Sequence, residues 1–172
     1  RRMLVYTPAG YQGGSARYPV MYLFHGGGGD EEAWNVMGRA SVILDNLIAD
    51  GKARPMIVVM PNANWNQMAV HDVGGPAPAV QPRGAAPAPG ATPAPQSYDV
   101  AEKAIVDDMV AYMEKNYRTL KGRENRAIAG LSMGGGISIN VGLKRLDVFA
   151  TVAQLQALGL SRASYAWKIA LP

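Results

Sequence analysis

Short apolar runs and helical patterns alternate along this chain, and this alternation restricts the possible folds more than any other feature. Residues 2–8 and 19–26 are rich in β-branched or aromatic side chains and end near Pro or Gly, which is typical of strands. An apolar run begins at Met56 and is ended by Pro61. Such a run predicts a strand that is buried on both faces of a sheet.

Helical patterns separate these strands. Residues 41–51 carry Ile43 and Leu44 on one expected apolar face and end at Gly51, a residue suited to the position after a helix. Apolar residues recur with the helical period over residues 97–117. A strand, a glycine-opened helix and a further strand then follow, at residues 126–131, 133–145 and 148–153. This order implies βαβ units, so the expected class is α/β, a mostly parallel sheet with helices on both faces.

Length and composition indicate one domain, which we expect to span residues 1–172. The chain has 172 residues and is 48% hydrophobic, enough for a single core. Residues 73–97 are mostly Ala, Pro and Gly, with Arg83 as their one charge, and cannot bury a core. Because this segment separates a strand from a helix of the same sheet, we interpret it as a disordered insertion, with a substrate lid as the alternative.

Composition also excludes several classes of function. The net charge of +4 comes from scattered Lys and Arg residues, which argues against nucleic-acid binding. The chain has no cysteine, so disulfides, thiolate nucleophiles and cysteine-ligated metals are excluded. No apolar run reaches the length of a membrane span, and the first residues lack the apolar region of a signal peptide. The chain begins inside an expected strand, and we expect both of its ends to be cut relative to a longer parent.

A serine between glycines is the strongest chemical motif. Residues 130–134 read Gly-Leu-Ser-Met-Gly, with an expected strand running in and a helix running out, as a nucleophile elbow requires. The two glycines let neighbouring backbone pass without a Cβ clash. The N–H of Met133 would lie at a helix N-terminus, suited to a developing oxyanion. The alternative is a glycine-rich junction in which Ser132 caps the helix.

A second glycine motif follows the strand at residues 19–26. Residues 25–29 read His-Gly-Gly-Gly-Gly, an arrangement that supplies a second oxyanion donor in esterase-like sheets; the candidates are the N–H groups of Gly27 and Gly26. No Gly-Lys-Ser/Thr follows, which excludes a phosphate loop, and no helix begins directly on the glycines, which excludes a dinucleotide site. The imidazole of His25 is expected to bond neighbouring backbone, with a general base as the alternative.

These motifs together resemble the esterase family of α/β-hydrolases that includes feruloyl esterases, acetylxylan esterases and enterochelin-esterase-like proteins. The stretches that carry the likeness are residues 18–34, 57–64, 105–117 and 126–153. The resemblance implies an α/β-hydrolase fold and hydrolysis of a carboxylic ester through an acyl-serine, without a cofactor or metal. The implied substrates are feruloyl or acetyl esters of plant polysaccharide, and the implied location is secreted or periplasmic.

The resemblance also assigns roles to individual residues. Ser132 matches the nucleophile, and the N–H groups of Met133 and Gly27, with Gly26 beside it, match the oxyanion hole. Trp34 matches an aromatic residue after the glycine loop, which would cover that loop or act as a substrate platform. Asn64, like its neighbour Asn62, follows a strand at the sheet edge where ligands bind, or is an ordinary loop residue.

The chain departs from the family pattern after the serine. The triad acid and histidine should follow Ser132, yet only one acid, Asp147, and no histidine do so. Asp147 is expected in a turn, the triad acid and base are not evident, and His71 could reach the site only by a long swing. The tail, residues 154–172, is either a divergent helix or a truncated end.

Two readings of the function therefore stay open at the level of sequence. One is a serine esterase represented by an incomplete chain, which would be weakly active or inactive alone. The other is a non-catalytic binding protein of esterase fold. In either case an incomplete sheet would expose an edge that favours self-association.

Overall fold

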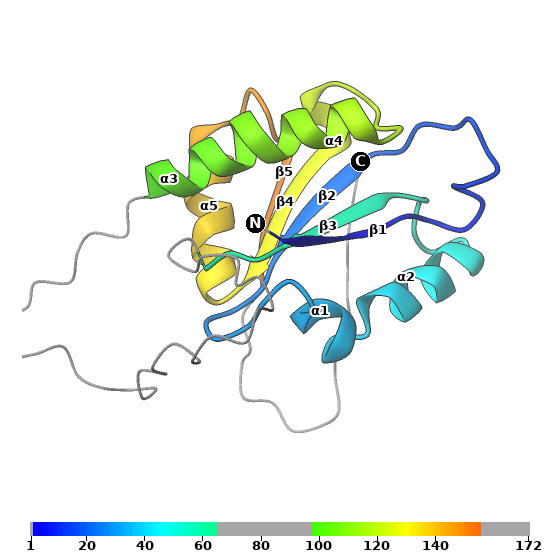
Figure 1. Ribbon diagram of the computed structural model, residues 1–172, viewed down its shortest axis with the longest axis horizontal. Helices are drawn as coiled ribbons and strands as arrows, with labels where there is room; N and C mark the ends of the chain where they lie inside the picture. The colour runs from blue at the N-terminus through cyan, green and yellow to red at the C-terminus, as the bar shows by residue number, and fades with distance from the viewer. Residues whose placement is uncertain (1, 65–97, 156–172) are drawn as a thin grey trace, which may run out of the picture.

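Five strands form one mixed sheet in the order β1-β3-β2-β4-β5 (Figure 1). The computed structural model describes residues 2–64 and 98–155. The strands are β1 (Met3–Tyr6), β2 (Val20–Phe24), β3 (Ile57–Pro61), β4 (Arg126–Leu131) and β5 (Thr151–Leu155). Strands β3, β2, β4 and β5 are parallel, whereas β1 pairs antiparallel with β3. The expected α/β class with a mostly parallel sheet is confirmed, and the antiparallel edge strand is an addition to it.

The longer helices lie where the sequence pattern predicts them, and two short ones, α1 and η2, are additions. They are α1 (Ala33–Val36), α2 (Ala40–Ala49), α3 (Tyr98–Lys103), η1 (Ala104–Val110), α4 (Ala111–Asn116), the short η2 (Arg123–Asn125) and α5 (Met133–Lys144). α3, η1 and α4 follow one another without a break, and η1 is the wider π-helical turn within them. The single turn α1 was not predicted, because four residues are too few to show a helical period.

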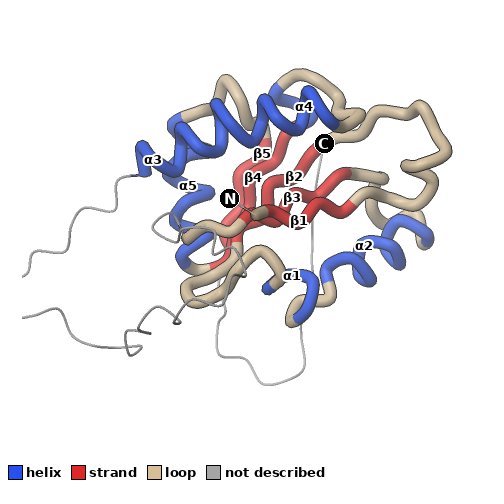
Figure 2. Tube along the Cα trace, in the orientation of Figure 1, coloured by secondary structure: helices blue, strands red, loops and turns tan. Residues whose placement is uncertain are grey.

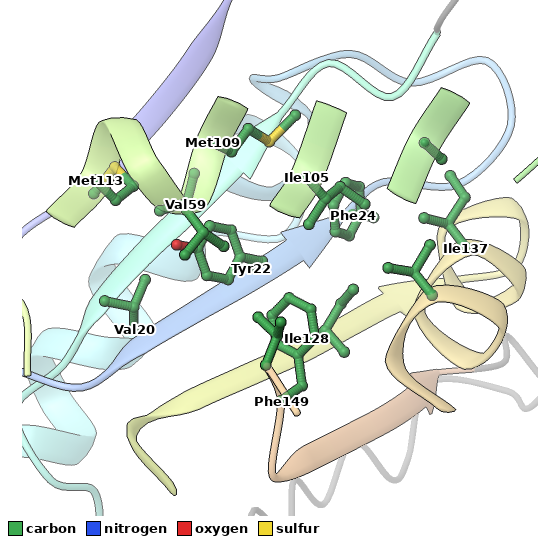
Figure 3. Packing of buried hydrophobic residues seen from close by; sticks show 14 of the residues in the cluster. Val20, Tyr22, Phe24, Val59, Ile105, Met109, Met113, Ile128, Ile137 and Phe149 are labelled. Atoms are coloured by element: carbon green, nitrogen blue, oxygen red, sulfur yellow. The ribbon is translucent and has the colours of Figure 1, made fainter. Parts of the chain in front are cut away.

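Helices cover both faces of the sheet (Figures 1 and 2). On one face, α5 and the helix made of α3, η1 and α4 pack against Tyr22, Phe24 and Ile128, as Figure 3 shows. On the other face, Leu44 of α2 packs with Leu23 in a second cluster. The residues of β3 alternate between these two clusters, which accounts for the complete burial of this strand.

Helix α2 ends in the hydrogen-bond pattern expected after a C-terminal glycine. The N–H of Gly51 donates to the Ile48 carbonyl at 3.0 Å, and the N–H of Lys52 donates to the Leu47 carbonyl at 2.8 Å. Gly51 has a φ of 68°, the left-handed conformation that this motif needs. The predicted apolar face of this helix is only partly right: Leu44 is buried, whereas Ile43 is 36% exposed.

Some expectations fall on residues that the structure does not describe. The insertion at residues 73–97 lies outside the described residues, as do His71 and residues 156–172 of the tail. The first two tail residues, Gln154 and Leu155, continue β5. Within residues 2–64 and 98–155, no helix combines the length and apolarity that crossing a membrane requires.

The end of α2 gives a test of the fold. We expect Gly51→Ala to lower the free energy of unfolding by about 1–2 kcal/mol, because a Cβ is strained in the left-handed conformation. Gly13→Ala is the matched control, since Gly13 has open space around it and no positive φ. The control should change stability by less than about 0.5 kcal/mol. Urea unfolding of both variants measures the difference, and equal losses would contradict the role of Gly51.

Candidate active site

Ser132 lies in the turn between β4 and α5 and is exposed. Its backbone has φ 52° and ψ −109°, a region that non-glycine residues rarely occupy. The Ser132 N–H donates to the Leu155 carbonyl at 3.1 Å, and the Ser132 carbonyl accepts from the Gly136 N–H at 2.9 Å. Although Ser132 stands at the N-cap position, its side chain makes no capping hydrogen bond to α5. The hydroxyl is therefore not engaged with its own helix.

The two glycines around this turn allow backbone segments to meet. A Cβ on Gly130 would lie 2.3 Å from the carbonyl carbon and oxygen of Gly134. A Cβ on Gly134 would lie 2.5 Å from the Phe24 carbonyl oxygen and 2.6 Å from that of His25. Because neither distance leaves room for a side chain, both positions require glycine. The first turn of α5 consequently rests directly on the end of β2.

The glycine loop after β2 lies next to the turn that carries Ser132. A Cβ built on Gly26 would be 3.5 Å from the Leu131 carbonyl oxygen, an ordinary contact distance. His25 is 2% exposed, and its Nδ1 lies 2.8 Å from the Gly26 carbonyl oxygen. The Ala63 N–H donates to His25 Nε2 at 3.0 Å. Both ring nitrogens of His25 thus bond backbone groups, which agrees with the role expected from sequence.

Two asparagines join this loop to the segment after β3. The Asn64 side-chain amide donates to the Gly29 carbonyl at 2.9 Å. The Asn62 amide donates to Glu31 Oε2 at 2.9 Å, and Asn62 Oδ1 accepts from the Asn64 N–H at 3.0 Å. Both residues therefore hold the loop.

Trp34 packs against the face of the sheet that α2 covers. It is partly buried against the cluster on the α2 face, and a Cβ on Gly38 would lie 3.1 Å from its ring. Of the two roles that the sequence left open, this packing favours a structural one.

Helix α5 contributes an electrostatic element to the site. Met133 is its first residue, and the dipole of a helix of this length places partial positive charge at that end. The Met133 N–H therefore lies in an electrically favourable place for an anion. In the described part of the chain, no group of three or more His, Cys, Asp or Glu side chains could hold a metal ion.

Asp147 lies beyond the opposite end of α5 from Ser132, about 18 Å away along a twelve-residue helix. Two hydrogen bonds join it to Arg145, at 3.0 and 2.9 Å. These bonds hold the pKa of the Asp147 carboxyl below its ordinary value. Asp147 is a turn residue, as expected, and is too far from Ser132 to serve as a triad acid.

A cavity of about 970 Å³ lies elsewhere on the molecule, between β1 and the helix formed by α3, η1 and α4. Glu31 and Glu32 of the loop before α1 reach its wall, but Ser132 and Met133 do not. This cavity is therefore separate from the turn that carries Ser132.

Comparison with known proteins agrees with this geometry. A model of the family described as "Putative esterase" matches residues 1–167. The chain belongs to this family. It is 37% identical over 149 residues to an endo-1,4-beta-xylanase/feruloyl esterase of Xylanibacter ruminicola, covering 84% of this chain and 18% of that protein.

Solved structures show the same architecture. A ferulic acid esterase superposes with a TM-score of 0.63 at 30% identity, covering 86% of this chain and 50% of the other. A CE1 ferulic acid esterase of Anaeromyces mucronatus, in complex with ferulic acid, gives 0.60 at 30% identity, with 87% and 50% covered. The fold is that of α/β-hydrolase esterases. The chain spans about half the length of these structures and a smaller share of the curated relative.

One contact at the site could not be read from local sequence. The carbonyl that accepts from the Ser132 N–H belongs to Leu155, at the end of β5. Pairing of Leu131 with Leu155 in the parallel register brings the two segments together. The sequence predicted strand β5, but it placed the end of this strand at residue 153, two residues before the observed end at Leu155.

Backbone strain at Ser132 gives a second prediction. A non-glycine residue in such a conformation costs about 1–3 kcal/mol. We expect the free energy of unfolding of Ser132→Gly to be about 1 kcal/mol above that of Ser132→Ala. Glycine relieves the backbone strain, and this gain exceeds its entropy cost of about 0.5–1 kcal/mol. Urea unfolding of the two variants measures this difference. A Ser132→Gly variant less stable than Ser132→Ala would show that the turn is not strained.

Proposed function

We propose that this chain carries the nucleophile and oxyanion hole of a serine carboxylic-ester hydrolase. The observation that carries the proposal is the exposed Ser132 hydroxyl in a strained strand-to-helix turn, directly beside the Gly26–Gly27 segment. Membership of the esterase family supports the same reaction class. A strained serine at a helix N-terminus is the arrangement that acyl transfer uses.

The proposed reaction has two steps. Ser132 Oγ attacks the ester carbonyl carbon as a base takes the hydroxyl proton, and the carbonyl oxygen becomes an oxyanion. The N–H groups of Met133 and Gly27 stabilise that charge, with Gly26 packed beside them. The C–O bond to the alcohol then breaks, the alcohol receives the proton, and water hydrolyses the acyl-serine to release the acid.

We further propose feruloyl or acetyl esters of plant polysaccharide as substrates. The names of a curated relative and of similar solved structures, which are feruloyl or ferulic acid esterases, support this choice. Such substrates lie outside the cell, so the proposed location of the protein is secreted or periplasmic. The proposed chemistry uses no cofactor.

The proposed reaction needs a base beside Ser132 to take the hydroxyl proton. The chain has two histidines, and both ring nitrogens of His25 are bonded to backbone. His71 is the remaining histidine. Within the described residues, no histidine or carboxylate is hydrogen-bonded to Ser132. The alternative function is a binding protein of esterase fold that performs no chemistry, and the missing partner of Ser132 fits both functions equally.

Chemical rescue distinguishes the two functions. Hydrolysis of methyl ferulate is measured for the unsubstituted 172-residue chain, called the parent chain below, and for the Ser132→Ala and His71→Ala variants. Each is measured with and without added imidazole. If the nucleophile and oxyanion hole are present, imidazole should supply the base and raise the Ser132-dependent rate about 10²-fold, the lower end for general-base catalysis. Ser132→Ala corrects for direct hydrolysis by imidazole.

The His71→Ala rate then identifies the base. A loss of the imidazole-free rate in this variant would assign that role to His71. Identical rates for the parent chain and Ser132→Ala at every imidazole concentration would contradict the esterase proposal. Saturable binding of ferulate in that case would support the binding protein.

Self-association is a separate proposal. Among the described strands, β1 and β5 each pair on one side only, so two sheet edges present unpaired backbone groups. We expect sedimentation to show a mass that rises with protein concentration. A monomer at all concentrations, with one sharp cooperative melt, would contradict this expectation.

A further inference from the structure

The buried ring of His25 has a defined protonation pattern. Its Nε2 accepts a hydrogen bond from the Ala63 N–H at 3.0 Å. A backbone N–H can only donate, so Nε2 carries no proton. The proton of the neutral ring must therefore lie on Nδ1, which donates to the Gly26 carbonyl oxygen at 2.8 Å. The two contacts together specify one tautomer.

The carbonyl that accepts this hydrogen bond belongs to the peptide between Gly26 and Gly27. Its oxygen is held a second time, by the Gly29 N–H at 3.1 Å. A trans peptide is planar, so its C=O and N–H point in opposite directions. Fixing the direction of the Gly26 oxygen consequently fixes the direction of the Gly27 N–H. In the described part of the chain, that N–H donates to no other group.

The surroundings of the ring fix its position. A Cβ built on Gly29 would lie 3.0 Å from His25 Nδ1 and 3.2 Å from His25 Cβ, so the Gly29 backbone packs closely on this side chain. The Gly29 carbonyl is held in turn by the Asn64 amide at 2.9 Å. The ring thus links the glycine loop to the segment after β3, and it has little room to rotate.

We propose that His25 is a positioning residue: as the neutral tautomer with its proton on Nδ1, it aims the Gly27 N–H at the oxyanion that forms on the ester carbonyl oxygen when Ser132 attacks. The catalytic consequence rests on the proposed esterase function, whereas the tautomer and the direction of the N–H do not. The same two bonds prevent His25 from acting as the base, because Nε2 already holds the Ala63 N–H.

Two near-isosteric substitutions separate the two bonds of the ring. In His25→Asn, the side-chain amide nitrogen stands close to the place of Nδ1 and can still donate to the Gly26 carbonyl. In His25→Gln, the side-chain oxygen can reach the place of Nε2 and still accept from the Ala63 N–H, while the donor to Gly26 is lost. A purely structural role would make the two variants equivalent or make the Ala63 bond the more important one.

The first measurement uses the ring itself. In ¹⁵N-labelled His71→Ala protein, all histidine ring signals come from His25, since the chain has two histidines. We expect the Nδ1-protonated tautomer at neutral pH, with a slowly exchanging ring N–H. The Nε2-protonated tautomer, or a doubly protonated ring, would overturn the proposal. This result depends neither on catalysis nor on the folding of a His25 variant.

The second measurement follows the direction of the Gly27 N–H. Residual dipolar couplings of the parent chain, His25→Asn and His25→Gln report the orientation of this bond. We expect His25→Asn to keep the parent value and His25→Gln to change it, with couplings of the core strands unchanged in both. Parent values in both variants would overturn the proposal.

The kinetic measurement connects this direction to the reaction. With methyl ferulate and imidazole, we expect His25→Gln to lower kcat by 10²–10³-fold, the effect of losing about one oxyanion donor, with little change in KM. His25→Asn should remain within about tenfold of the parent chain, since it keeps the donor. The reverse order would overturn the proposal. Absence of any Ser132-dependent turnover would instead count against the esterase function and leave the two spectroscopic results to decide on His25.

Discussion

The direct contact between the first turn of α5 and the end of β2 determines most of this structure. In the parallel pairing of β2 with β4, Phe24 lies opposite Gly130, and both strands end within one residue of that pair. One becomes the glycine loop and the other the turn at Ser132. Because Gly134 has no side chain, its backbone can lie against the Phe24 and His25 carbonyls. Ser132, the proposed nucleophile, and the glycine loop after β2 are neighbours for this reason.

The two histidines raise the question of where the serine proton goes. A buried imidazole bonded through both nitrogens can orient backbone, but it has no free lone pair for a proton. His25 therefore belongs to the scaffold of the glycine loop. An efficient serine hydrolase also needs a base at hydrogen-bond distance from the hydroxyl. An oxyanion hole without that base supports about 10³–10⁴-fold acceleration over water, well below that of a complete triad.

Sequence reasoning succeeded where the signal was local and failed where it came from a distant segment. The burial of β3 could be predicted, because a continuous apolar run has no polar face to expose. The tight turn from strand to helix at Ser132 could be predicted too, since Gly130 and Gly134, whose positions leave no room for a side chain, lie within five residues of sequence. The bond from Ala63 to His25 joins residues 38 positions apart, and no local pattern encodes it. Ile43 was misplaced because helical periodicity does not show where the neighbouring strands end.

Helix α5 forms although its glycine-rich sequence has a low helix propensity. It contains four glycines, at positions 134, 135, 136 and 142, each of which disfavours a helix interior by about 1 kcal/mol relative to alanine. Three of them lie where a Cβ would collide, with β2, Gln154 or Val152. The buried Ser138 hydroxyl donates to the Gly134 carbonyl at 2.8 Å, so this polar group is buried with a hydrogen-bond partner. Close packing on three strands therefore offsets a weak helical propensity. The helix exists because the sheet holds it, and the strained turn in front of it depends on the same contacts.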